Sequence, residues 1–133
     1  MRDVNRINID GLSITETRVS KVNTKGGNIV FLTDNKFDIG ETKGKRLYVV
    51  NHAWHMGLDV HAEIPREMSV IADYAEEGRE FFIRAAVGEY KKDDALIVGA
   101  AGGIEKGEGD VFAYAQETFK IEEDQDLLRV RIA

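Results

Sequence analysis

The run Leu127-Leu128-Arg129-Val130-Arg131-Ile132 alternates between apolar and basic side chains close to the end of the chain. Successive side chains of an extended strand point to opposite faces of its sheet. Leu128, Val130 and Ile132 therefore share one face, and the two arginines share the other. This pattern predicts a β-strand with one buried side.

Similar short runs recur along the chain between glycine-containing turns, which is typical of all-β proteins. The run 58–64 shows the same clean alternation, with Leu58, Val60, Ala62 and Ile64 on one face. Helical signals are weak, and we expect a strand rather than a helix within 64–77. The full set of predicted strands covers residues 12–22, 28–33, 46–51, 58–64, 69–75, 80–87, 95–99, 111–117 and 127–132.

Two of these runs are apolar on both faces, namely Phe81-Phe82-Ile83 and Val111-Phe112-Ala113-Tyr114. A strand of this kind is covered on both sides, as in a closed or sandwiched sheet or at a subunit interface. The predicted fold class is therefore mainly β with little helix. We expect a small β-barrel or β-sandwich, either jelly-roll-like or β-tulip-like.

The length of 133 residues suits one domain. We expect residues 13–133 to form a single β-rich domain and the polar residues 1–12 to form an N-terminal arm.

There is no apolar run long enough to cross a bilayer, so we expect no membrane partner. The first ten residues lack the apolar stretch of a signal peptide, and the chain has no cysteine, which favours synthesis in a reducing cytoplasm.

The net charge of −6 is unevenly distributed. Residues 1–67 carry 10 basic and 9 acidic side chains, whereas residues 68–133 carry 8 basic and 15 acidic ones. Nucleic-acid-binding proteins concentrate basic side chains to displace counterions from phosphates. The acidic second half argues against a nucleic-acid partner; it either steers the domain onto a basic protein surface or keeps it soluble.

All three histidines, His52, His55 and His61, lie within ten residues, and imidazole is a common ligand of transition metals. This cluster supports an alternative hypothesis, a small β-barrel or cupin-like metalloprotein. The spacing is unfavourable on a strand, because His52 and His55 would point to opposite faces. We therefore favour surface or interface histidines and expect no metal.

No other group of residues predicts catalysis. The chain lacks cysteine and a G-x-S-x-G motif, and no Lys-Ser/Thr follows the glycine-rich run Gly99–Gly103. We therefore expect a protein without enzymatic activity or cofactor. Trp54 and Met56 stand in a loop-like setting, where they either pack onto the core or anchor a protein interface.

From about Arg66 onward the order of features resembles small decoration, or cement, proteins of tailed-phage heads. The resemblance rests on strand-like runs joined by characteristic turns rather than on catalytic residues, and it covers roughly the second half of the chain. Lys92-Asp93-Asp94 stands where the family more often has Lys-Gly-Asp. The segments that carry the resemblance are Phe81–Gly88, Lys91–Val98, Gly102–Lys106, Gly109–Glu117 and Leu127–Ile132.

The resemblance implies a structural virion protein that binds the exterior of an assembled capsid and stabilises its lattice through multivalent contacts. Its partner would be the major capsid protein, and it would act as a homo-oligomer, a trimer or a dimer. The N-terminal arm would add a strand to a free edge of the capsid protein. The predicted interface residues are Arg2, Asn5, Arg6, Ile7, Ile9, Trp54 and Met56.

Overall fold

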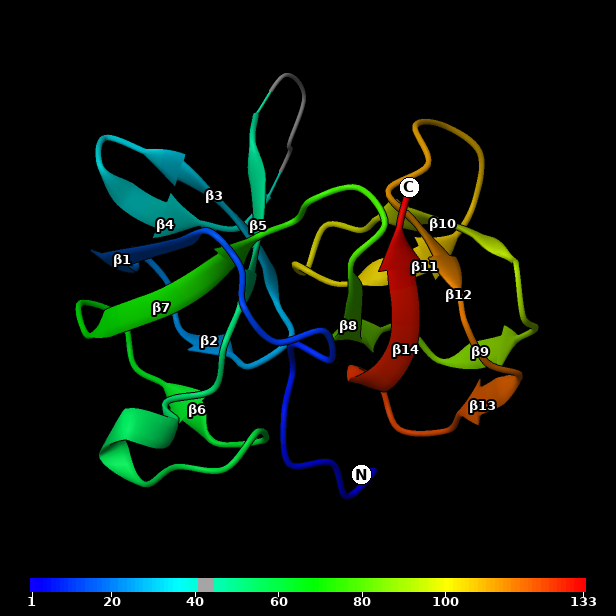
Figure 1. The fold of residues 1–133 in the computed structure, drawn as a ribbon, viewed down its shortest axis with the longest axis horizontal. Helices are drawn as coiled ribbons and strands as arrows, with labels where there is room; N and C mark the ends of the chain where they lie inside the picture. The colour runs from blue at the N-terminus through cyan, green and yellow to red at the C-terminus, as the bar shows by residue number, and fades with distance from the viewer. Residues whose placement is uncertain (41–44) are drawn as a thin grey trace.

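A computed structural model describes residues 1–40 and 45–133. Figure 1 shows two β-structures side by side, one built from the N-terminal half and one from the C-terminal half. The fold is mainly β, which confirms the predicted class; the described helical structure is a single 3₁₀ turn, Trp54–Met56. No helix within 1–40 or 45–133 has the length and apolarity needed to cross a membrane. The strands are β1 (Thr15–Val19), β2 (Thr24–Lys25), β3 (Ile29–Thr33), β4 (Lys36–Asp38), β5 (Leu47–Val50), β6 (Glu63–Ile64), β7 (Ser69–Tyr74), β8 (Glu80–Ala85), β9 (Gly88–Tyr90), β10 (Ala95–Val98), β11 (Ile104–Lys106), β12 (Ala113–Ala115), β13 (Phe119–Ile121) and β14 (Asp126–Ile132).

The N-terminal half forms a five-stranded sheet in the order β1-β7-β5-β3-β4. The sheet curls so that its two ends meet: Ser20, just after β1, makes a parallel bridge to Phe37 in β4. The amide of Lys21 donates to the carbonyl of Phe37 at 2.8 Å. The enclosed core contains Val30, Phe37, Tyr48, Val50, Ala53, Ile64, Val70 and Ala72.

The C-terminal half forms a closed barrel in the order β10-β11-β8-β14-β12. In its longest antiparallel pairing, β14 runs alongside β8 with Val130 opposite Phe81. Leu128 and Val130 are fully buried, whereas Arg131 is exposed, so the predicted alternation of this strand is confirmed. Ile29 and Val49 from the N-terminal sheet join the barrel's core cluster, which ties the two halves together.

The N-terminal segment 1–12 lies along the edge of β8. The amide of Phe82 donates to the carbonyl of Ile7 at 2.9 Å, and the amide of Ile9 donates to the carbonyl of Glu80 at 3.1 Å. The Ile7 side chain is 1% exposed and belongs to the barrel core. The N-terminal segment therefore pairs with backbone groups of β8 that would otherwise be exposed at its edge.

The sequence correctly predicts a strand rather than a helix in 64–77, where β7 forms. The predicted strand 58–64 is wrong, because only Glu63 and Ile64 are extended. A carboxylate oxygen of Asp59 accepts a hydrogen bond from the His61 amide at 2.9 Å, which stabilises a turn instead. Tyr114 is 41% exposed, so the chain itself covers only one face of this run.

Candidate functional site

The histidines lie on the loop that follows β5, but they do not converge. His55 is exposed on the 3₁₀ turn, while His61 lies near the barrel. Both ring nitrogens of His61 are occupied, Nδ1 by the Arg84 guanidinium at 3.0 Å and Nε2 by the carbonyl of Arg2 at 2.6 Å. Among the described residues no group of three or more potential ligands could hold a metal ion. The alternative metalloprotein hypothesis thus gains no support from the geometry.

Arg84 is fully buried, at 0% exposure, in the wall between the barrel and the loop. Its guanidinium donates to the carbonyls of Gly26 at 2.7 Å, Val60 at 2.6 Å and Gln125 at 3.1 Å. Burial lowers the pKa of Arg84 to about 10, against the opposing effect of two nearby carboxylates. Arg84 therefore fixes the loop that carries the histidines onto the barrel.

Arg2, a predicted contact residue, is engaged inside the chain. Its guanidinium forms an ion pair with Glu117 and lies 4.0 Å from the ring centroid of Phe119. Its amide donates to Asp126 at 3.0 Å. The half-buried Arg2 thus holds the N-terminal segment against the barrel.

The other predicted interface residues divide by exposure. Ile7 is buried and Ile9 is half-buried, whereas Asn5 and Arg6 are exposed. Trp54 is 61% exposed and Met56 is 42% exposed, so neither is part of the core. The structure brings Asn5, Arg6, Ile7 and Trp54 together around one open pocket.

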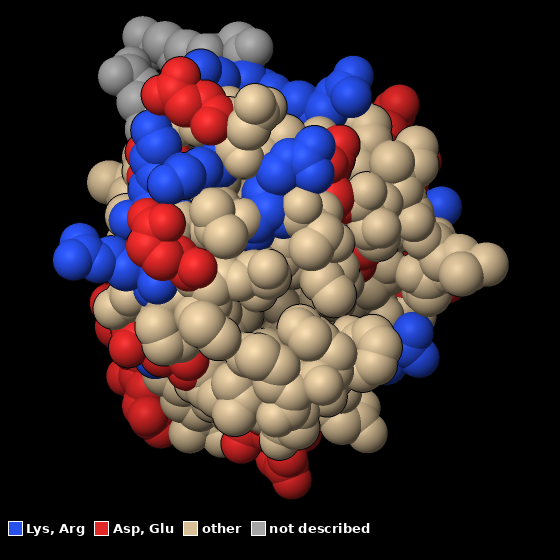
Figure 2. Space-filling view, turned by 90° about the vertical axis from the view of Figure 1, so that its left-hand side faces the viewer, with Lys and Arg blue, Asp and Glu red and all other residues tan. Residues whose placement is uncertain are grey.

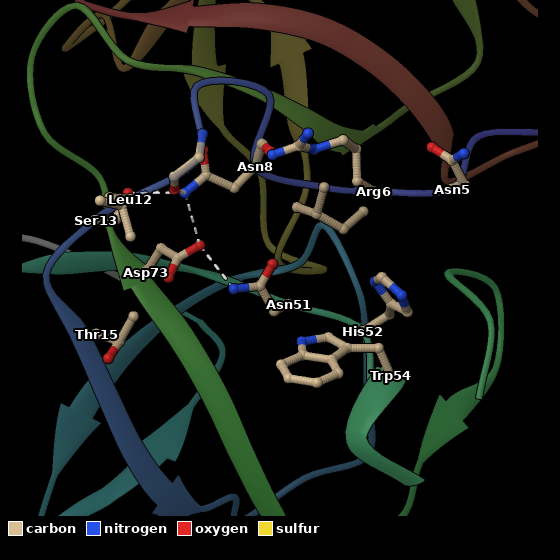
Figure 3. A pocket seen from close by; sticks show the side chains of 12 residues that line it. Asn5, Arg6, Asn8, Leu12, Ser13, Thr15, Asn51, His52, Trp54 and Asp73 are labelled. Carbon is tan, nitrogen blue, oxygen red and sulfur yellow. Dashed lines mark hydrogen bonds between the residues drawn. The ribbon is translucent and has the colours of Figure 1, made fainter. Parts of the chain in front are cut away.

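This pocket, of about 740 Å³, lies between the N-terminal segment, the start of β1 and the Trp54 turn. We call it the Asp73 pocket after the carboxylate in its wall. Figure 3 shows Trp54 at one side, Thr15 at the other and the side chains of Asn51 and Asp73 between them. Most of its lining residues are polar, including Asn5, Asn8, Ser13, Thr15, Asn51 and Asp73, and they surround apolar surface from Ile7, Leu12 and Trp54.

Asp73 is only 2% exposed, and two side-chain amides donate hydrogen bonds that compensate for its burial. Its Oδ2 accepts hydrogen bonds from Nδ2 of Asn8 at 3.0 Å and from Nδ2 of Asn51 at 2.7 Å. Asn8 is itself fixed, because its Nδ2 also donates to the Ser13 hydroxyl at 2.8 Å. Burial raises the pKa of Asp73 above its ordinary value, and the two amide hydrogen bonds and Arg79 partly offset this effect.

His52 lines the same pocket above the Trp54 ring (Figure 3). Burial lowers the pKa of His52 below its ordinary value, although Asp59 acts in the opposite direction. At neutral pH its ring is therefore uncharged, with one nitrogen able to donate and the other able to accept.

Sequence reasoning missed Asp73, Asn51 and Asn8 as site residues. The available signal was Asp73 itself, an acidic residue inside the otherwise apolar strand β7. Its two amide partners come from positions 65 and 22 residues away in the sequence, so local patterns could not have identified them.

Charged side chains are unevenly placed on the side of the molecule drawn at the left of Figure 1. Figure 2 shows acidic and basic groups gathered mainly along the upper part and one edge of this side, with a broad area of uncharged residues below. Exposed apolar side chains near the Asp73 pocket include Leu12, at 93% exposure, and Ile14, at 63%. This side offers much uncharged surface for contact with a partner or ligand.

The curled five-stranded sheet and the closed barrel define a mainly β, barrel-containing protein. Its backbone is similar to that of the head fiber gp8.5 N base in bacteriophage phi29, with a TM-score of 0.58 and 13% sequence identity. The similarity covers 92% of this chain and 95% of the phage chain. No protein-family model matches the sequence, and no curated protein matches it.

Proposed function

We propose that this chain is a structural protein of a phage virion that binds the exterior of the assembled capsid. The observation that carries the proposal is the fold likeness to a phage head fiber base over nearly the full length of both chains. The resemblance of the second half to head decoration proteins is an independent argument for the same location. The major capsid protein is the proposed partner, and the role requires no reaction.

Lattice stabilisation through multivalent contacts is the second part of the proposal. A dimer or trimer at a symmetry axis of a capsid engages several capsid subunits at once, so modest individual contacts add up to firm attachment. The acidic second half of the chain, with 15 acidic against 8 basic side chains, favours a basic protein surface over nucleic acid.

The structure changes which residues are available for this attachment. Arg2 and Ile7 are engaged within the chain, so a contact through them would require the N-terminal segment to leave its own barrel. Asn5, Arg6 and Met56 are accessible without rearrangement and stay as proposed capsid contacts. Trp54 is accessible too, but it lines the Asp73 pocket, whose surroundings fit a small ligand.

The test is a binding experiment with purified phage heads that lack this protein. Increasing amounts of the chain are mixed with the heads, the heads are sedimented, and bound copies are counted by densitometry and imaged by electron microscopy. We expect saturation at a copy number that matches a set of symmetry axes, and heads that withstand a higher temperature. Absence of saturable binding would refute capsid attachment, and saturable binding without thermal protection would refute stabilisation.

Replacement variants are better suited than truncation for mapping the contacts. Deleting residues 1–10 removes Ile7 from the barrel core and uncovers the edge of β8, which would confuse folding with binding. The variants N5A, R6E and M56A change exposed side chains and leave that edge covered. Each variant should weaken head binding while its melting temperature stays close to that of the parent chain.

A further inference from the structure

We infer that the Asp73 pocket binds an uncharged saccharide through the Trp54 ring and the amide groups beside it. The pocket lies between three separate parts of the chain, and the inference goes beyond capsid attachment.

The composition of the pocket argues for a small polar ligand. Protein-binding grooves and drug-like sites are lined mainly by apolar side chains with a few polar groups. The lining of the Asp73 pocket is mixed instead, with amide and hydroxyl groups beside the apolar side chains of Ile7, Leu12 and Trp54. A pyranose ring matches this lining, because its C–H face is apolar and its edge carries hydroxyl groups.

Trp54 is held where such a ring could stack. The turn is fixed by the buried Ala53 before it and by Gly57 after it, whose amide donates to the carbonyl of Trp54 at 2.9 Å. Gly57 adopts a φ of 75°, which a glycine takes without strain. The indole therefore stays 61% exposed beside the pocket on a defined turn, instead of folding into the core.

The hydrogen-bonding groups are preorganised as well. Asp73 Oδ2 accepts one N–H from each of Asn8 and Asn51, which fixes the orientation of both amides. The amide oxygen of Asn51 then points away from Asp73, on the side facing the pocket (Figure 3). An amide oxygen is a hydrogen-bond acceptor, and sugar hydroxyls are donors as well as acceptors. Asp73 is a positioning residue in this arrangement, because it is almost entirely buried.

Charge decides between a neutral and an anionic saccharide. The buried Asp73 carboxylate contributes negative charge, and the burial of His52 keeps the imidazole beside Trp54 neutral. Arg6 also lines the pocket, with its Nε bonded to the carbonyl of Asn8 at 2.8 Å, and its positive charge offsets the negative charge of Asp73. A neutral pyranoside suits a lining whose charges offset each other, and its hydroxyl groups can bond the amide oxygen of Asn51 and the imidazole of His52.

The test uses the full chain and an array of mono- to tetrasaccharides containing gluco-, galacto-, manno-, N-acetylamino- and uronic-acid pyranosides. Because Trp54 is the single tryptophan, its fluorescence reports directly on the pocket during titration with each sugar that binds the array. We expect a neutral pyranoside to bind and to change this fluorescence saturably. Absence of binding by every neutral sugar, or binding of uronic acids alone, would overturn the inference.

Variants separate this site from capsid attachment. W54A and N51A should each weaken saccharide binding by roughly tenfold or more in calorimetric titration, whereas W54F should retain most of it. Y114A is the matched control, because it removes an exposed aromatic side chain from the C-terminal barrel and should leave saccharide binding unchanged. Unchanged saccharide binding by W54A would overturn the inference. So would a loss of head binding by W54A, which would make Trp54 a protein contact.

Discussion

The Arg84 guanidinium donates from Nη1 to the Nδ1 atom of His61, 3.0 Å away, inside the wall that joins the barrel to the preceding loop. A guanidinium has no acceptor, so His61 must present an unprotonated Nδ1. The carbonyl of Arg2, 2.6 Å from Nε2, has no donor, so Nε2 must carry the proton. The imidazole is thus a neutral bridge between a buried cation and the N-terminal segment.

Replacing Arg84 with methionine should destabilise the chain strongly. The carbonyls of Gly26, Val60 and Gln125 would lose their shared donor, and each unsatisfied buried group costs about 1–3 kcal/mol. We expect the free energy of unfolding in urea to fall by at least about 3 kcal/mol. R84K is the matched control: it keeps the charge but has no planar fork, so it should recover only part of the loss. A fall of less than about 0.5 kcal/mol in R84M would contradict this role.

The role of His61 as a one-donor, one-acceptor bridge can be tested with glutamine and alanine. Glutamine has both a carbonyl and an N–H group, so H61Q can serve Arg84 and Arg2 together. H61A leaves both unpaired and should cost about 1–3 kcal/mol in urea unfolding, with H61Q costing less. Long-range proton–nitrogen correlation spectra of the parent chain should show the Nε2-protonated tautomer. Equal losses in the two variants, or the Nδ1-protonated tautomer, would contradict the bridge.

Asp73 should give the stability an unusual pH dependence. Its pKa in the folded chain is raised above the ordinary value of 3.8, so the folded state binds more protons than the unfolded state between the two values. The contribution of Asp73 to stability therefore falls as the pH rises through this window, and the charged form is the less stable one above it. In D73N the Oδ1 atom can still accept from Asn8 and Asn51.

We therefore expect D73N to be at least as stable as the parent chain at neutral pH and to lack this component of the pH dependence. Urea unfolding at a series of pH values from about 3 to 8 measures both properties. N51A serves as a comparison, because it removes an amide that favours the charged carboxylate and should lower stability at neutral pH. A D73N chain that is clearly less stable at neutral pH would show that the buried charge stabilises the fold.

The sequence predicts the elements that local patterns define. The alternation in 127–132 identifies β14, and the strand character around Val70 correctly outweighs the helix formers near it. The strand prediction for 58–64 is wrong, because the Asp59 side chain stabilises a turn although the apolar residues alternate there. Arg84 could not be recognised as a buried residue, since its acceptors are supplied by three segments distant in sequence. The Asp73 pocket depends on tertiary contacts of the same kind.

Gly27 and Gly57 provide a matched pair that measures the close approach between the two halves. Both have positive φ, 89° and 75° respectively, so alanine at either position adds about 1 kcal/mol of backbone strain. At Gly27 a Cβ would also lie 2.7 Å from Leu127 Cδ2 and 3.0 Å from the carbonyl oxygen of Phe82, whereas nothing lies within 4 Å at Gly57. The amide of Arg84 donates to the Gly27 carbonyl at 3.0 Å, so displacing this segment would also disturb the edge of β8. We expect G57A to lose about 1 kcal/mol in urea unfolding, and G27A to lose about 1–3 kcal/mol more because of the added overpacking. Equal losses would mean that the Gly27 segment moves aside at no cost and that the contact between the two halves is looser than the described distances require.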